Sequence, residues 1–289
     1  MRSFGRLEST TVKLPGAGID LAADLYGDEA APPVLLLHGG GQTRHAWGRA
    51  AVTLAEAGYF AISIDLRGHG HSDWSPDGVY DMTRFGADVR SIAGSLGRPP
   101  ALVGASLGGL SCLVAVGEST DPIASSLVLV DVTPRIEVEG RQKIQGFMRA
   151  GMRGFDDLEA AADSIAAFIP HRPRPTDLSG LQKNLRQRGD GRWYWHWDPR
   201  WISNHEGVDG QSGLVHHDRL CAAARAVTIP TLLVRGRMSD IVSEEGVREL
   251  RELIPHAQVV DVAGAGHMVA GDKNDVFNEA VIDFVNRTS

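Results

Sequence analysis

Short apolar runs rich in valine, isoleucine and leucine recur along the chain, with stretches of helical periodicity between them. Runs of this length without alternation are typical of strands buried on both faces of a parallel sheet. They occupy residues 34–37, 60–64, 101–103, 127–130, 231–234 and 258–262. Between and after them, the periodicity predicts helices over residues 45–57, 83–96, 106–117, 243–253 and 272–287. This alternation predicts an α/β fold with a mostly parallel central sheet and helices on both faces.

The chain begins with a different pattern. Residues 9–26 alternate like two short strands around the sequence Pro15-Gly16-Ala17-Gly18. Such a turn between two alternating runs predicts an antiparallel hairpin ahead of the parallel sheet.

The alternation of predicted strands and helices stops between Asp131 and Thr228. Residues 134–221 contain no buried-strand pattern, although residues 141–150 and 156–168 have helical periodicity. About 90 residues are too many for a loop within a compact domain. We therefore expect an inserted, mainly helical lid over residues 134–221, with the core formed by residues 1–133 and 222–289.

Tryptophans are concentrated in one part of this insertion. Trp193, Trp195 and Trp197 alternate at period two, so an extended segment would place all three on one face. Asp190-Gly191 predicts a tight turn leading into that segment. Two interpretations stay open: the rings pack the insertion onto the core, or some of them, Trp195 and Trp197 in particular, line an apolar substrate pocket.

Composition excludes several classes of protein. The 29 basic and 36 acidic residues give a net charge of −7, and no basic run could follow a phosphate backbone, which argues against nucleic-acid binding. Residues 1–6 lack the apolar core of a signal peptide, and no segment has the apolar length of a membrane span. Cys112 and Cys221 are too few for a disulfide framework and lack metal-ligand spacing. We expect a cytoplasmic protein with two reduced, buried cysteines; its oligomeric state cannot be read from the sequence.

A candidate nucleophile follows the third apolar run of the parallel set. The sequence Gly104-Ala105-Ser106-Leu107-Gly108 has the G-x-S-x-G pattern of a nucleophile elbow, in which a serine sits on a sharp turn between a strand and a helix. Glycines are needed two positions either side of the serine because the strand and the helix approach closely there. We therefore take Ser106 as the candidate nucleophile.

The other parts of a serine triad must come later, in the order acid and then histidine. His267 lies on a loop of small residues after the last apolar run, where its ring could reach a serine hydroxyl, and it is the candidate general base. Asp240, in the turn after residues 231–236, is the predicted acid because a carboxylate there could hold the histidine tautomer. Asp131, at the end of the preceding apolar run, is the alternative acid.

An oxyanion hole is predicted from the loop that follows residues 34–37. His38-Gly39-Gly40-Gly41-Gln42 would let backbone N–H groups approach a developing oxyanion with no side chain in between. The expected donors are the N–H groups of Gly40 and Leu107, with Gly39 and Gly41 as near alternatives. His38 precedes the loop and is expected to orient it by hydrogen bonding rather than to catalyse.

The segment Asp65-Leu66-Arg67-Gly68-His69-Gly70-His71-Ser72-Asp73 has the ligand types of a metal site. We interpret it as a structural turn, because its glycines reverse the chain after a buried strand and no second cluster completes a coordination sphere. We expect neither a metal nor a cofactor in the chemistry.

These motifs together resemble the α/β-hydrolase superfamily over nearly the whole chain. The resemblance rests on His38-Gly39-Gly40, the D-x-x-G-H-G-x-S turn from Asp65 to Ser72, residues 104–109, Asp240 and Gly266-His267. Residues 38–47, residues 130–135 and the Trp-rich segment are similar to a bacterial esterase subgroup and to proteins called non-haem haloperoxidases or perhydrolases. The resemblance implies the α/β-hydrolase fold and a small-molecule ester as substrate.

The expected reaction is ester hydrolysis through an acyl-enzyme, with a preference for small to medium apolar acyl groups. Epoxide hydrolases and haloalkane dehalogenases resemble this fold but carry aspartate at the elbow, so serine at position 106 argues against both. Lactone hydrolysis, perhydrolysis and carbon–carbon bond hydrolysis use the same three groups and stay open. A ligand-binding receptor without catalysis is the remaining alternative, because a fold alone does not establish a function.

Overall fold

The computed structural model of the chain describes residues 9–170, 172–203, 216–267 and 274–288. The N-terminal residues, from which no signal peptide was expected, lie outside this part, as does the start of the helix predicted from residue 272. Among the described helices, none is both long enough and apolar enough to cross a membrane.

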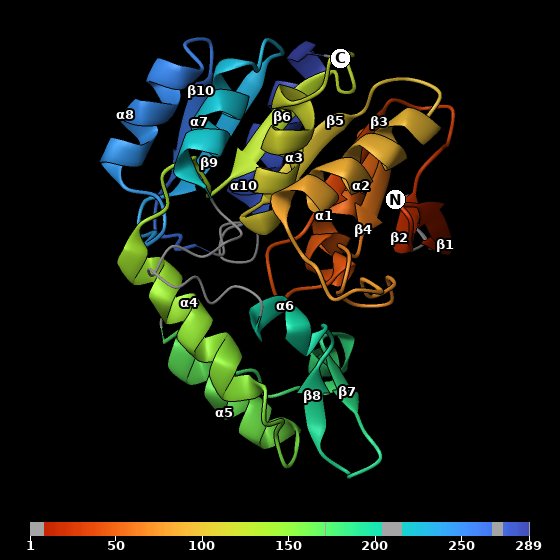
Figure 1. Cartoon of the computed structure of the whole chain (residues 1–289), viewed down its shortest axis with the longest axis vertical. Helices are drawn as coiled ribbons and strands as arrows, with labels where there is room; N and C mark the ends of the chain where they lie inside the picture. Colours follow the sequence, from red (N-terminus) through yellow and green to blue (C-terminus); the bar gives the residue numbers. More distant parts are fainter. Residues whose placement is uncertain (1–8, 171, 204–215, 268–273, 289) are drawn as a thin grey trace, which may run out of the picture.

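An eight-stranded sheet forms the centre of the molecule, in the order β1-β2-β4-β3-β5-β6-β9-β10 (Figure 1). The hairpin β1–β2 is antiparallel, β2 pairs antiparallel with β4, and the remaining neighbours are parallel. The strands are β1 (Thr10–Pro15), β2 (Asp20–Tyr26), β3 (Pro33–Leu37), β4 (Phe60–Ile64), β5 (Ala101–Ala105), β6 (Ser126–Val130), β9 (Thr231–Gly236) and β10 (Gln258–Val262). The predicted hairpin and mostly parallel sheet are confirmed.

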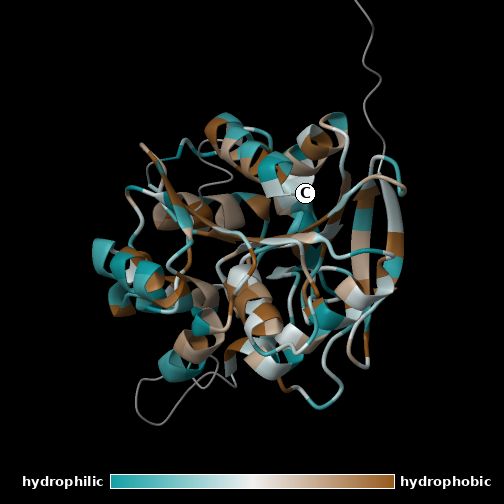
Figure 2. Ribbon diagram, turned by 90° about the horizontal axis from the view of Figure 1, so that it is seen from above, coloured by the Kyte–Doolittle hydropathy of each residue, from teal (hydrophilic) through white to brown (hydrophobic). Residues whose placement is uncertain are grey.

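Helices cover both faces of this sheet (Figure 2). Successive residues of a strand point to opposite faces, so each apolar strand presents buried side chains on both. Leu35 and Leu37 belong to one apolar core with α2, α3, α7 and α8, whereas Val34 and Leu36 belong to the other with α1 and α10. The helices are η1 (Arg44–Trp47), α1 (Gly48–Glu56), α2 (Met82–Ser95), α3 (Leu107–Gly117), α7 (His217–Arg225), α8 (Glu244–Leu253) and α10 (Asn274–Thr288). Both faces of the sheet are therefore buried, as its continuous apolar strands predicted.

Most of the chain between β6 and β9, residues 138–203, forms a separate group of elements beyond the sheet (Figure 1). It contains α4 (Val138–Gly151), α5 (Leu158–Phe168), η2 (Ser179–Lys183), the hairpin β7 (Leu185–Gln187) and β8 (Trp193–Trp195), and α6 (Pro199–Ser203). Phe147 of α4 stacks on Phe168 of α5. The expected end of the insertion at residue 221 falls inside α7, which packs on α3 in the core.

Backbone elements approach closely where β5 turns into α3. Ser106 has φ +46° at this turn, a conformation that residues with a side chain rarely adopt. A Cβ at Gly104 would lie 2.5 Å from the backbone of Gly108, and one at Gly108 would lie 2.4 Å from the carbonyl oxygen of Leu37. The glycines therefore let the end of β3 and the start of α3 touch, and this contact fixes the position of Ser106.

Gly108→Ala should destabilise the protein by about 3 kcal/mol or more, because the added methyl group meets backbone atoms that no rotamer change can move. Gly94→Ala is the matched control, since Gly94 lies in α2 with open space around its Cα. That change should be neutral or stabilising by up to about 1 kcal/mol. Urea unfolding monitored by circular dichroism would measure both changes, and equal stabilities of the two variants would contradict this account of the turn.

Candidate functional site

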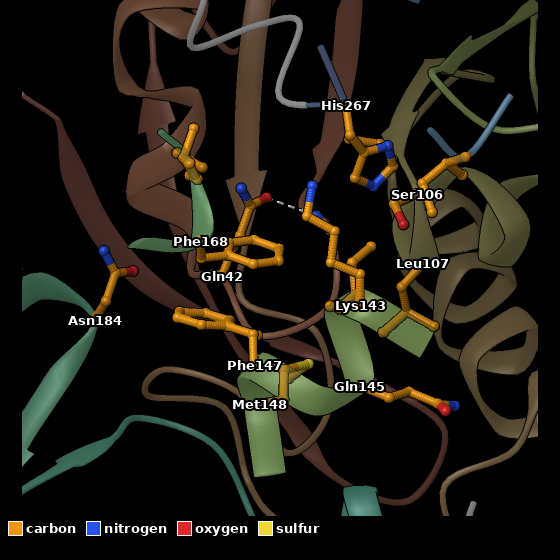
Figure 3. A pocket seen from close by; sticks show the side chains of 18 of the residues that line it. Gln42, Ser106, Leu107, Lys143, Gln145, Phe147, Met148, Phe168, Asn184 and His267 are labelled. Carbon is orange, nitrogen blue, oxygen red and sulfur yellow. Dashed lines mark hydrogen bonds between the residues drawn. The ribbon is translucent and has the colours of Figure 1, made fainter. Parts of the chain in front are cut away.

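Ser106 lies at the carboxyl end of β5 and lines a cavity together with His267. Figure 3 shows the two side chains at the same wall of that cavity. The N–H of Ser106 donates to the carbonyl oxygen of Val130 at 3.1 Å, and its carbonyl oxygen accepts from Leu110 inside α3. The backbone on both sides of the serine is thus tied to β6 and α3, leaving the hydroxyl at the cavity surface.

The imidazole of His267 is held by a buried carboxylate. Its Nδ1 lies 2.7 Å from Oδ2 of Asp131, whose side chain is fully buried, while the histidine itself is 17% exposed. Because an ionised carboxylate only accepts hydrogen bonds, Nδ1 carries the proton and Nε2 keeps its lone pair. This is the tautomer that can accept a proton from a serine hydroxyl.

The partner of the histidine is therefore Asp131 and not the predicted Asp240. Asp240 is exposed in the loop after β9, where its Oδ2 accepts from Nζ of Lys143 on α4 at 3.0 Å. The sequence pattern favoured Asp240 over Asp131 because the two residues follow neighbouring strands. Strands β6 and β9 pair in parallel and end at the same edge of the sheet. An aspartate after either strand satisfies the sequence pattern. Only the path of the loop after β9 determines which of the two carboxylates faces His267.

Ser239 is a part of this site that the sequence did not reveal. Its Oγ donates to Oδ2 of Asp131 at 2.5 Å and accepts from the N–H groups of Ile241 and Val242. The N–H of Gly236 donates to the other oxygen of Asp131 at 2.9 Å. The buried carboxylate is thus satisfied on both oxygens, which a buried charge requires. Ser239 takes the position facing Asp131, so the next residue, Asp240, points away.

In the glycine loop after β3, two of the three successive backbone N–H groups have hydrogen-bond acceptors. Gly39 donates to Oε1 of Gln42 at 2.9 Å, and Gly41 donates to Nε2 of His69 at 3.1 Å. The N–H of Gly40 has no hydrogen-bond acceptor among the described residues, and neither has that of Leu107 at the first position of α3. These are the two groups that the sequence predicted as oxyanion donors, and their engagement with an oxyanion stays a prediction.

Two buried histidines hold this loop in place. Nε2 of His38 accepts from the N–H of Leu66 and its Nδ1 lies 2.8 Å from the carbonyl oxygen of Gly39. His69 pairs its Nδ1 with the carbonyl oxygen of Arg67 and its Nε2 with Gly41. Burial lowers the pKa of both rings, that of His69 to about 3, so both are neutral at physiological pH. The predicted orienting role of His38 agrees with this geometry.

The turn from Asp65 to Asp73 is held by internal hydrogen bonds. The fully buried carboxylate of Asp65 accepts from the backbone N–H groups of Arg44 and His71 and from the Arg44 guanidinium. Ser72 donates to the carbonyl oxygen of Asp65 and accepts from the N–H of Ala22 on β2. Its side chains therefore fasten the loop to the sheet, as a structural turn would.

The cavity over Ser106 has a volume of about 620 Å³, within the usual range for small-molecule sites. Its wall opposite the serine is mostly apolar and comes from the insertion, with Phe147 and Met148 of α4 and Phe168 of α5 (Figure 3). Charged groups also reach it, among them Lys143, whose ammonium group is paired with Asp240. The cavity therefore lies between the core and the insertion.

Two tryptophans of the insertion both pack against other aromatic rings and line the cavity. Trp195 lines the cavity and packs between Phe147 and Phe155, with ring centroids 5.6 and 5.4 Å apart. Trp197 also lines it but is almost fully buried, and its ring lies edge-on to Trp201. Trp193 is not among the lining residues, so two of the three alternating rings face the cavity.

Comparison with known proteins agrees with this architecture. A family model described as the alpha/beta hydrolase fold matches residues 32–273. The esterase Rv0045c of Mycobacterium tuberculosis is 32% identical over 261 residues, which cover 87% of this chain and 82% of that protein. The 2-(acetamidomethylene)succinate hydrolase of Mesorhizobium japonicum is 27% identical, with 89% of each chain covered.

Solved structures of two hydrolases are also similar to this chain over nearly its whole length. A crystal structure of E-2-(acetamidomethylene)succinate hydrolase matches with a TM-score of 0.84 at 25% identity, over 96% of this chain and all of that one. A structure of the esterase Rv0045c matches with a TM-score of 0.73 at 29% identity, over 98% of this chain and 93% of the other. The similarity thus extends through the insertion as well as the sheet.

Asp131→Asn should slow the labelling of Ser106 by a fluorophosphonate probe by about 10³-fold or more, because an amide at this position favours the wrong histidine tautomer. Asp240→Asn is the matched control and should label within a few-fold of the unmodified protein, since only an exposed ion pair is lost. Mass spectrometry of the labelled peptide gives both the rate and the modified residue. A larger loss in Asp240→Asn would return the role of the acid to that residue.

Proposed function

This chain belongs to the α/β-hydrolase fold family and is a carboxylesterase-type member of it, and we propose that it cleaves esters of small to medium apolar acids through Ser106, His267 and Asp131. The observation that carries the proposal is the buried hydrogen bond between Nδ1 of His267 and Asp131, beside a serine on a strained turn. Membership of the family alone does not specify a reaction. The proposal therefore rests on this arrangement of three side chains.

In the first step, Oγ of Ser106 attacks the ester carbonyl carbon while Nε2 of His267 takes the hydroxyl proton. Asp131 stabilises the imidazolium that forms, and the N–H groups of Gly40 and Leu107 donate to the oxyanion. His267 then gives its proton to the departing alcohol, leaving an acyl-enzyme. In the second step, water gives a proton to His267 as its oxygen attacks the acyl carbonyl carbon. The bond from that carbon to Oγ then breaks, and His267 returns the proton to Oγ as the acid leaves.

The insertion acts in this proposal as a lid that shapes the acyl pocket. Its aromatic and aliphatic side chains supply the apolar wall opposite Ser106, and Trp201 lies so close to the glycine loop that a Cβ at Gly40 would come within 2.6 Å of its ring. An unpaired charge buried against such a wall would lose its hydration without compensation. Esters with apolar acyl groups are therefore the favoured substrates.

Ser106→Ala tests the proposed function directly. A panel of p-nitrophenyl esters from acetate upward, with lactones beside it, would be hydrolysed by the unmodified protein, and the variant should lose several orders of magnitude in kcat because the triad acts as a unit. Circular dichroism should show an unchanged fold. Undiminished hydrolysis by Ser106→Ala, or no hydrolysis of any ester by the unmodified protein, would contradict the proposal.

Trp195→Ala should extend the range of acyl chains toward longer ones, because it removes a ring from the cavity wall. Trp193→Ala is the matched control, since Trp193 lies on the same strand without lining the cavity. We expect a shift of the preferred chain length in the first variant only, with the pH profile of kcat unchanged in both. If Trp195→Ala changed only the melting temperature, the role of this ring would be packing.

A further inference from the structure

Three metal-binding side chains converge on the face of the molecule that carries α7 and α8. His217 and Cys221 are one helical turn apart on α7, and Glu249 comes from the middle of α8. Nε2 of His217 lies 3.4 Å from Sγ of Cys221 and 3.0 Å from Oε1 of Glu249. All three ligand atoms lie within 4.8 Å of one another.

We propose that these residues form a binding site for a divalent transition metal, with Zn²⁺ as its best-suited ion. A tetrahedral zinc ion with ordinary bond lengths holds its nitrogen, sulfur and oxygen ligands roughly 3.4–3.6 Å apart. The observed separations of 3.0 and 3.4 Å are close to that spacing and the third is at most 4.8 Å, so small side-chain rotations would bring all three ligands to the ion, with water in the fourth position. One imidazole, one thiolate and one carboxylate also match the mixed ligand preference of zinc.

Without a metal, hydrogen bonds among these three side chains would leave some of their polar atoms without a partner from the cluster. Nε2 of His217 faces both the sulfur and the carboxylate, yet it can donate one hydrogen bond or accept one, and not both. The thiol of Cys221 is buried, and its sulfur lies 3.4 Å from the same Nε2. Binding of Zn²⁺ would displace the thiol proton to solvent, and the ion would then bond to the sulfur, Nε2 and the carboxylate together.

The position of the cluster predicts what the ion would do. None of the three residues lines the cavity over Ser106, so the site is separate from the proposed catalytic one. Helix α7 packs on α3 and α8, and it brings the chain back from the insertion to the core (Figure 1). A metal bridging α7 and α8 would therefore fasten the returning end of the insertion to the core.

The sequence shows only part of this site. His217 and Cys221 have the four-residue spacing that places two side chains on one helix face. Glu249 follows 28 residues after Cys221, and nothing in the sequence indicates that α8 packs beside α7. The site therefore depends on the packing of two helices.

Titration of tag-free protein, stripped with a chelator and kept reduced with a phosphine, would test the site with zinc chloride alone. We expect one equivalent bound in calorimetry and a rise of about 5 °C or more in melting temperature at saturation. Cobalt(II) should give a thiolate-to-metal charge-transfer absorption that reports ligation by the sulfur. Cys221→Ala and Glu249→Gln should each weaken zinc binding by 10-fold or more and Cys221→Ala should abolish the absorption.

The chain offers matched controls for two of the ligand types. Cys112→Ala removes the other buried thiol, and His216→Ala removes the adjacent histidine that is not in the cluster; neither should alter zinc affinity. Zinc binding that persists in Cys221→Ala but is lost in His267→Ala would overturn the proposal and move the metal to the triad. No saturable binding by the unmodified protein would also overturn it, and neither result bears on ester hydrolysis by metal-free protein.

Discussion

The close approach of three backbone segments around Ser106 is the constraint on which the rest of the molecule depends. Gly104 and Gly108 allow α3 to start against the carbonyl oxygens that end β3, and the N–H of Gly108 donates to His38 at that contact. This geometry holds the serine at φ +46°, which is strained for a residue with a side chain. Packing on both faces of the sheet compensates for the strain. The backbone conformation of Ser106 therefore depends on the packing of the whole core.

A second strained residue lies on the neighbouring strand. Asp131 has φ +47° and ends β6 in the same way that Ser106 ends β5. Its buried carboxylate joins β6 to the end of β9 through Gly236, to the following loop through Ser239, and to the last loop of the sheet through His267. A single buried carboxylate therefore joins three loops that are far apart in the sequence.

Much of this architecture follows from local sequence patterns. Continuous apolar runs specify the parallel strands, and Gly104, Ser106 and Gly108 specify the turn, because each pattern is contained within a few consecutive residues. The choice between Asp131 and Asp240 could not be predicted in this way, since both follow strands that end at one edge of the sheet. It depends on Ser239 occupying the inward position. The contact of α7 with α3, beside the expected end of the insertion at residue 221, likewise depends on packing that the short sequence of α7 does not reveal.

The loop after β9 is divided between two tasks at neighbouring positions. Ser239 points inward to Asp131, whereas Met238, Asp240 and Ile241 line the cavity. The carboxylate that is hydrogen-bonded to His267 comes from the turn after β6, so the acid of the proposed triad is none of these three residues. In the proposed mechanism the loop can therefore accept different side chains at the exposed positions 238 and 240 as long as Ser239 is kept, whereas Ile241 is buried in the core. It is a natural place to redesign substrate preference, for example by a small combinatorial library, without rebuilding the proton-transfer residues.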